Sequence, residues 1–303
     1  MNRIRQPDWL LSIIERFNQF RADPRVLSIL RIVSILYPLG LLYLSKEEIH
    51  NIHWRSFIWV FLGCVAVYYV SMSLQNIVWS LIVDGNFSRF WINSQVYFRT
   101  ILMKRLPGGV WHWLGRSSLY ELNFPDEDRE ISRSNFTEWL VLILTGLTGY
   151  ATTKSIYLGI IGLIILLVVT TILLVKNGKG FARSLFTAAG IIFFYTLCWL
   201  AGGLILHYLL TSVISPGFVA FATSFSAWCL SSAISMVVFF FPSGALIRDF
   251  SLTALLTHQI EPAKVALIIL QVRLVFLVAD FLWSFLSLQV IKHITSKDDP
   301  MAN

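Results

Sequence analysis

Long apolar runs with few charges are the feature of this sequence that most constrains its fold. A helix that crosses a membrane needs about 20 mostly apolar residues, and a backbone in lipid must satisfy its own hydrogen bonds. The runs that predict crossings are residues 26–44, 56–82, 136–150, 156–175, 185–210, 218–241, 245–258 and 263–291. Because they are continuous and do not alternate with polar residues, they predict helices. We therefore expect an all-α, polytopic membrane protein with about eight spans.

Composition supports the same fold class. Hydrophobic residues make up 56% of the chain and charged residues 14%, whereas about a quarter of a typical soluble chain is charged. We expect a cytoplasmic amphipathic arm at 1–25, one transmembrane domain at 26–292 and a short polar tail at 293–303. With no sizeable soluble domain expected, any chemistry that needs a folded water-soluble catalytic domain must come from another chain.

The positive charges predict the orientation. The net charge is +7, and Lys and Arg concentrate in the N-terminal arm, in 83–135 and in the 176–184 connection. Positive loops favour the cytoplasmic side, so we expect the N-terminus inside and the protein in the cytoplasmic (inner) membrane. A crossing at 245–258 would also bring Lys292 and Lys297 inside. The basic residues form no stripe outside this pattern, so we expect no nucleic-acid partner.

Neither a metal site nor a cofactor site is expected from the sequence. Cys64, Cys198 and Cys229 lie inside apolar runs at spacings unlike those of metal ligands, and we interpret them as packing residues. The sequence contains no GxxxxGK[ST] loop and no HExxH motif. Gln75 and Asn76 in the second expected span are interpreted as partners in helix–helix hydrogen bonds.

Two segments combine helix-breaking residues with arginine. The first is KRLPGGVWHWLGR at 104–116, and the second is FPSGALIRDF at 241–250. Irregular backbone is tolerated at membrane depth only where protein or a wet cavity surrounds it. We expect both to be re-entrant or interrupted segments, and their recurrence in the two halves favours an inverted repeat.

The first segment also carries a family resemblance. Tyr97, the stretch 104–116, and Glu138 at the start of an apolar run that ends in Gly146 together resemble the membrane domain of the lysylphosphatidylglycerol synthase family. In that family a K-Y-L-P-G-G-V-W-H pattern precedes G-R and an acidic residue that opens the next helix.

Two stretches in the second half extend the resemblance. FPSGALIRDFSLTALL (241–256) is similar to the family's P-G-G-L-G-V-R-E and the apolar stretch that follows, although Ser243 and Asp249 replace a glycine and a glutamate. QVRLVFLVADFLW (271–283) is similar to a family helix with an arginine and a later acid. The resemblance implies a flippase-like membrane domain of the stand-alone form, without the soluble aminoacyl transferase.

The first broken segment suits the phosphate of a lipid headgroup. A helix that starts after the Pro-Gly-Gly break presents unpaired N–H groups and its positive dipole end, both of which favour an anion. Arginine adds a bidentate phosphate contact, and His112, Arg116 and Tyr120 share one face at four-residue spacing. The expected substrate-binding residues are Lys104, Pro107, Gly108, Gly109, His112, Arg116, Gly244 and Arg248.

Buried ionisable residues inside spans cost free energy and face the protein interior. Arg273 and Asp280 lie seven residues apart on one helix face. We expect Glu138, Asp249 and Asp280 to neutralise Arg116, Arg248 and Arg273 when no lipid is bound, with the pairing left open.

Three functions remain open at this point. The first is a non-enzymatic lipid transporter that moves a phospholipid or polyprenyl-phosphate lipid between leaflets. The second is an intramembrane headgroup transferase or hydrolase that would use His112, Tyr120 or Glu138, although no catalytic set is recognisable. The third is an accessory subunit of a membrane enzyme such as a lipid-linked glycosyltransferase.

Overall fold

The computed structural model describes residues 24–105, 111–123, 128–176, 180–214, 220–237 and 244–298, and these residues form helices without any strand. The all-α fold class is therefore confirmed for the described part of the chain. Most of the expected N-terminal arm and the last five residues lie outside it.

The helices follow one another with short connections. The first part of the chain contains α2 (Pro24–Leu44), α3 (Lys46–His50), α4 (Trp54–Asp84), α5 (Phe90–Ile101), the short 3-10 helix η1 (Leu102–Arg105), α6 (Trp111–Asn123) and α7 (Asp128–Lys154). The second part contains α8 (Ile156–Lys176), α9 (Phe181–Val213), α10 (Phe221–Val237), α11 (Gly244–Leu256) and α12 (Pro262–Asp298).

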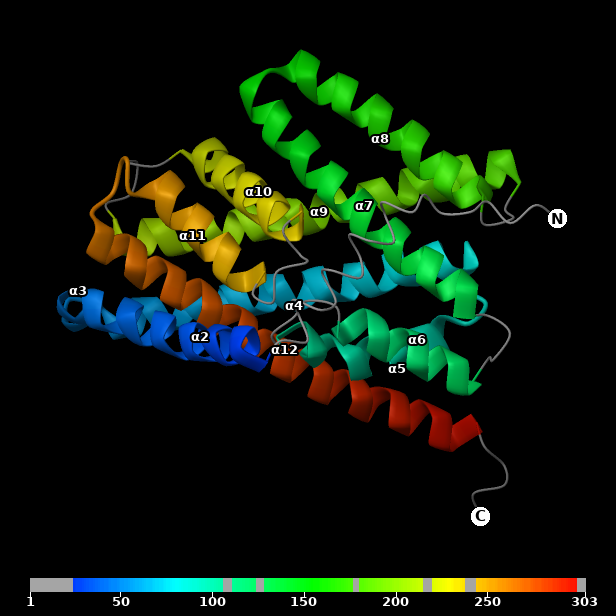
Figure 1. Cartoon of the computed structure of the whole chain (residues 1–303), viewed down its shortest axis with the longest axis horizontal. Coiled ribbons are helices and arrows are strands. Elements are labelled where there is room, and N and C mark those ends of the chain that lie inside the picture. The colour runs from blue at the N-terminus through cyan, green and yellow to red at the C-terminus, as the bar shows by residue number, and fades with distance from the viewer. Residues whose placement is uncertain are drawn as a thin grey trace.

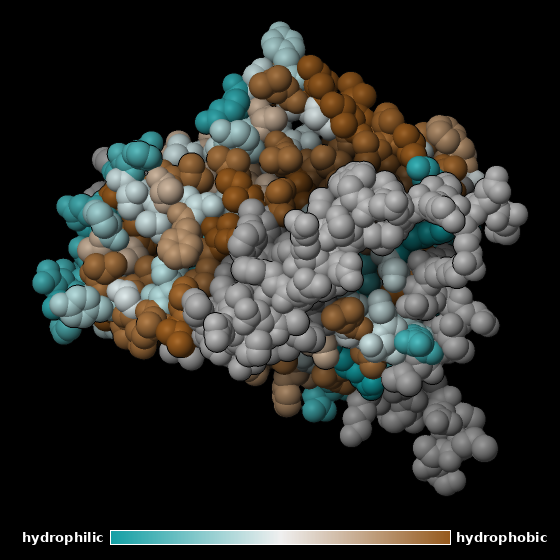
Figure 2. Space-filling view, in the orientation of Figure 1, coloured by the Kyte–Doolittle hydropathy of each residue, from teal (hydrophilic) through white to brown (hydrophobic). Residues whose placement is uncertain are grey.

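Four of the described helices are long and apolar enough to cross a membrane: α4, α8, α9 and the Pro262–Gln289 part of α12. A helical membrane protein is thereby supported, while the count of eight spans stays a prediction. Apolar side chains of α8 are largely exposed, and hydrophobic atoms cover the upper edge of the molecule where α8 lies (Figure 2). Such a surface suits contact with lipid.

Two expected segments have different lengths in the structure. The helix expected at 136–150 begins much earlier and forms the 27-residue α7, because Glu138 and the polar residues before it continue the helix instead of ending it. The crossing expected at 218–241 is the 17-residue α10, and α11 has only 13 residues. At 1.5 Å per residue these two helices are about 25 and 20 Å long, short of the ~30 Å hydrocarbon core.

The long helices α4 and α9 pack along each other through the middle of the molecule, with α12 beside α4 (Figure 1). The pair α5 and α6 and the pair α10 and α11 each lie side by side. α10 approaches α9 closely because Gly202 and Gly203 leave room for the rings of Trp228 and Phe225. The three cysteines are buried and free, as the packing interpretation predicts.

Candidate functional site

The candidate site is centred on Arg116, whose side chain is almost completely buried in α6. Its Nη1 donates a hydrogen bond to Oε2 of Glu138 in α7, which is buried as well. The guanidinium carbon lies 4.2 Å from the centre of the Trp79 ring and 4.5 Å from that of Tyr97. Ring faces attract a cation, and this attraction grows when water is excluded. Arg116 is therefore stabilised by one carboxylate and two aromatic rings.

Two buried donors in this region make no hydrogen bond to the described residues: Nε of Arg116 and the hydroxyl of Tyr195 in α9. Tyr195 is fully buried and interacts electrostatically with both Arg116 and Glu138. Buried donors normally have a partner, so each exception calls for an explanation. Both donors could therefore form hydrogen bonds to an acceptor group of a ligand.

A chain of hydrogen bonds runs from the Trp79 ring to the end of α4. Trp79 Nε1 donates to the hydroxyl of Tyr120 over 3.3 Å, and that hydroxyl donates to Oδ1 of Asn93. Asn93 Nδ2 donates to Oδ2 of Asp84 at 2.6 Å, and Arg89 Nε donates to Oδ1 of Asp84 at 3.0 Å. The chain fixes the ring on which Arg116 lies and joins α4, α5 and α6.

Gln75 and Asn76 act as the sequence predicts. The hydroxyl of Tyr97 donates to Oε1 of Gln75 at 3.2 Å, and Nδ2 of Asn76 donates to Ser94 Oγ at 2.8 Å. Both are hydrogen bonds between α4 and α5, and the first holds the Tyr97 ring against Arg116.

A second ion cluster consists of Arg248, Asp249 and Arg273. The carboxylate of Asp249 is fully buried and accepts a hydrogen bond from Arg273 Nε in α12, while Nε of Arg248 lies 3.5 Å from its other oxygen. The Arg248 guanidinium lies 4.9 Å from the ring centre of Phe276, and that of Arg273 lies 5.0 Å from Tyr37. The carboxylate of Asp249 thus lies close to both guanidinium groups.

The two ion clusters occupy comparable places in the chain with their charges exchanged. Arg116 is the sixth residue of α6 and pairs with an acid near the eleventh position of the following long helix. Asp249 is the sixth residue of α11 and pairs with Arg273, the twelfth residue of α12. In α11 the position that Arg116 has in α6 is thus occupied by the acid Asp249, and Arg248 directly precedes it.

Tyr68 of α4 connects the two regions. Its ring stacks on Phe276 with centroids 4.3 Å apart, and Phe276 lies under Arg248. Tyr68 also packs against the buried cluster that contains Trp79 and Tyr97. Tyr68 thus contacts both the ring that lies under Arg248 and the hydrophobic cluster that contains the rings beside Arg116.

The remaining expected site residues fall into three groups. Pro107, Gly108 and Gly109 lie outside the described residues, as does the side chain of Lys104 in η1. His112 is half-buried, and its ring contacts that of Trp113 edge to face at 5.8 Å. Gly244 opens α11, and Asp280 is buried two turns beyond Arg273 in α12.

Trp79, Tyr97 and Tyr195 are the residues of this site that the sequence did not single out as ligands. Aromatic residues are frequent in this chain, with 11 Trp and 10 Tyr, so their presence in a span carries little information. The available signal was the run of polar residues Gln75 and Asn76 one turn before Trp79, which marks an interior helix face.

Comparisons of the chain with protein-family models, with curated proteins and with solved structures produce no match. Among the described residues no group of three or more His, Cys, Asp or Glu side chains is placed to hold a metal ion.

Proposed function

We propose that this chain is a flippase-like transporter that moves a phosphate-bearing lipid between the leaflets of a cytoplasmic membrane. The observation that carries the proposal is the buried Arg116, which follows the Pro-Gly-Gly segment in the sequence and keeps an unused Nε donor, together with the unused hydroxyl of Tyr195, which interacts electrostatically with Arg116. A phosphate accepts hydrogen bonds at several oxygens and matches a guanidinium in shape. The resemblance of 104–116 to the lysylphosphatidylglycerol synthase membrane domain supports the same function.

The proposed architecture is an inverted repeat. The order α2, α4, α5–α6, α7 would correspond to α8, α9, α10–α11, α12: in each half two long helices, a pair of short helices and a third long helix. The α5–α6 and α10–α11 pairs lie toward opposite ends of the molecule (Figure 1). Each pair would enter the membrane and return on the same side. Because a re-entrant pair adds no net crossing, the C-terminus would lie on the same side as in a protein with eight crossings.

In the proposed mechanism the headgroup phosphate competes with Glu138 for Arg116. The carboxylate neutralises the arginine while no lipid is bound, because an isolated buried charge is strongly unfavourable. Binding of the phosphate would release Glu138 to a proton or to another partner. The sequence has no ATP-binding loop of the P-loop type, so movement would be downhill or coupled to an ion gradient.

The test is transport by the purified protein in vesicles that contain a fluorescent phospholipid, read as the fraction of label that reaches the opposite leaflet. Arg116→Ala is expected to abolish transport, but it also leaves Glu138 buried and unpaired, so it is expected to fold poorly. The decisive variant is Arg116→Gln/Glu138→Gln, which removes both charges and keeps hydrogen-bonding groups. Arg133→Ala, an exposed site in α7, serves as the control.

Loss of transport in the folded Gln/Gln variant, with normal transport in Arg133→Ala, would support the proposal. Normal transport in the Gln/Gln variant would refute the role of Arg116. Mass spectrometry of co-purifying lipids, wild type against Arg116→Gln/Glu138→Gln, identifies the lipid. A chemically altered lipid would favour the transferase, and loss of a co-purifying enzyme's activity without transport would favour the accessory subunit.

A further inference from the structure

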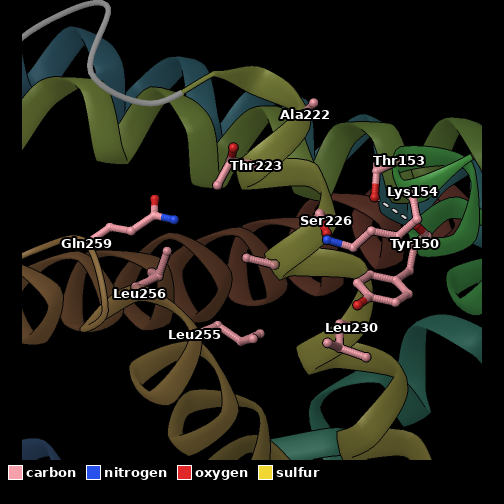
Figure 3. A pocket seen from close by; sticks show the side chains of 11 residues that line it. Tyr150, Thr153, Lys154, Ala222, Thr223, Ser226, Leu230, Leu255, Leu256 and Gln259 are labelled. Carbon is pink, nitrogen blue, oxygen red and sulfur yellow. Dashed lines mark hydrogen bonds between the residues drawn. The ribbon is translucent and has the colours of Figure 1, made fainter.

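A cavity of about 310 Å³ lies between the end of α7, the first half of α10 and the end of α11 (Figure 3). Ligand sites are typically ≈ 300–1,000 Å³, so this volume suits a small group rather than a whole lipid. Lys154 of α7 is the cation of its lining, and its side chain extends toward Ser226 of α10 (Figure 3). Glu138 lies 16 residues earlier on α7, about 24 Å along the helix axis. The cavity is therefore separate from the Arg116 site.

Hydrogen-bond donors dominate the polar side of the cavity. Besides the Lys154 ammonium it is lined by the hydroxyls of Thr223 and Ser226 and by the amide of Gln259, whereas the Thr153 hydroxyl donates to the Tyr150 carbonyl. Among the described residues that line the cavity there is no Asp or Glu. An ammonium group only donates, and hydroxyls donate whenever the partner only accepts. The lining thus fits an acceptor-rich anion and offers no carboxylate to a cation.

Two further features support an anionic ligand. The first turn of α10 supplies Ala222 and Thr223 to the wall, so the positive end of that helix dipole lies at the cavity. Lys154 is exposed, so a ligand can reach it from solvent, and Leu230, Leu255 and Leu256 form an apolar side of the cavity.

We infer that this cavity binds a single phosphate group through Lys154 and the hydroxyls of Thr223 and Ser226. The phosphate can belong to a lipid headgroup or to a water-soluble ligand, since both present the same acceptor oxygens. This site goes beyond the proposed transport function and does not depend on it, because its test reads binding rather than movement.

The test uses the full chain in micelles of a sugar-headgroup detergent, which carries no phosphate, with Ala222→Cys in the cavity wall labelled by a water-soluble maleimide. Cys64, Cys198 and Cys229 are buried, so the new thiol gives the signal. One arm adds inorganic phosphate at constant ionic strength, and the other adds phosphatidylglycerol to the micelles. Binding is expected to slow labelling, and Lys154→Gln is expected to raise the half-protecting concentration about tenfold or more, the factor for a hydrogen bond to a charged group.

Lys46→Gln is the matched control, because Lys46 lies over the ring of Tyr43 as Lys154 lies over the ring of Tyr150, but outside the cavity. Protection by inorganic phosphate would identify a soluble ligand, and protection only by phosphatidylglycerol would identify a lipid headgroup. Equal protection with and without Lys154→Gln, or no protection in either arm, would each overturn the inference.

Discussion

Asp249 of α11 and Arg273 of α12 form a buried ion pair that repeats, with exchanged charges, the pair of Arg116 and Glu138 between α6 and α7. In both cases a short helix carries one charge at its sixth residue and the following long helix carries the other. Both pairs also lie against aromatic rings. In both places a buried charge on a short helix is therefore neutralised by an opposite charge on the long helix that follows it.

Removing only one charge of the Arg116–Glu138 pair should destabilise the fold more than removing both charges. Arg116→Ala leaves the buried Glu138 without its partner, and such single changes cost about 3–5 kcal/mol. Arg116→Gln/Glu138→Gln leaves no charge and should recover most of that loss. Thermal unfolding in detergent of the two variants and the wild type checks the order. If the double variant were as unstable as Arg116→Ala, the charge itself would not explain the loss.

In the second ion cluster, replacing Asp249 should lower the unfolding temperature more than replacing either arginine. Asp249→Asn leaves the half-buried Arg248 and Arg273 close together without their shared carboxylate, so repulsion adds to the lost hydrogen bond. Arg248→Gln preserves the Asp249–Arg273 pair and should lower the unfolding temperature less. Equal effects of the two changes would contradict this account.

The close packing of α9 on α10 should not tolerate a methyl group at Gly202. A Cβ there would lie 2.0 Å from Nε1 of the Trp228 side chain, whereas at Gly190 in the same helix the nearest atom is 3.9 Å away. Gly202→Ala is expected to destabilise by about 1–3 kcal/mol through overpacking. Gly190→Ala should be neutral or stabilising by up to about 1 kcal/mol, because alanine favours helix. Unfolding midpoints of the two variants distinguish them.

The hydroxyl of Tyr120 should contribute to stability through Asn93 and Trp79. Tyr120→Phe removes a donor to Asn93 and an acceptor for Trp79 Nε1, and buried groups left unpaired cost about 1–3 kcal/mol. Tyr208→Phe, at an exposed position of α9, should have little effect on the unfolding midpoint. A neutral Tyr120→Phe would show that the hydrogen-bond chain from Trp79 to Asp84 is not required.

Much of the fold could be predicted from the sequence because it depends on properties that are local along the chain. Apolar run length predicts α4, α8, α9 and α12 to within a few residues at most ends. The Pro and Gly residues predict breaks in the sequence between α5 and α6 and between α10 and α11. The length of α7 was missed, because polar residues can continue a helix when neighbouring helices cover them.

The site could be predicted only in part. Sequence reasoning identified the charged residues Arg116, Glu138, Asp249 and Arg273, since an ionisable residue in an apolar run stands out by itself. Which acid meets which base, and which rings lie beside each guanidinium, depended on contacts between helices distant in the sequence. Burial and pairing belong to the packed helices together, so only the tertiary structure decided that Trp79 and Tyr97 flank Arg116 and that Asp249 serves two arginines.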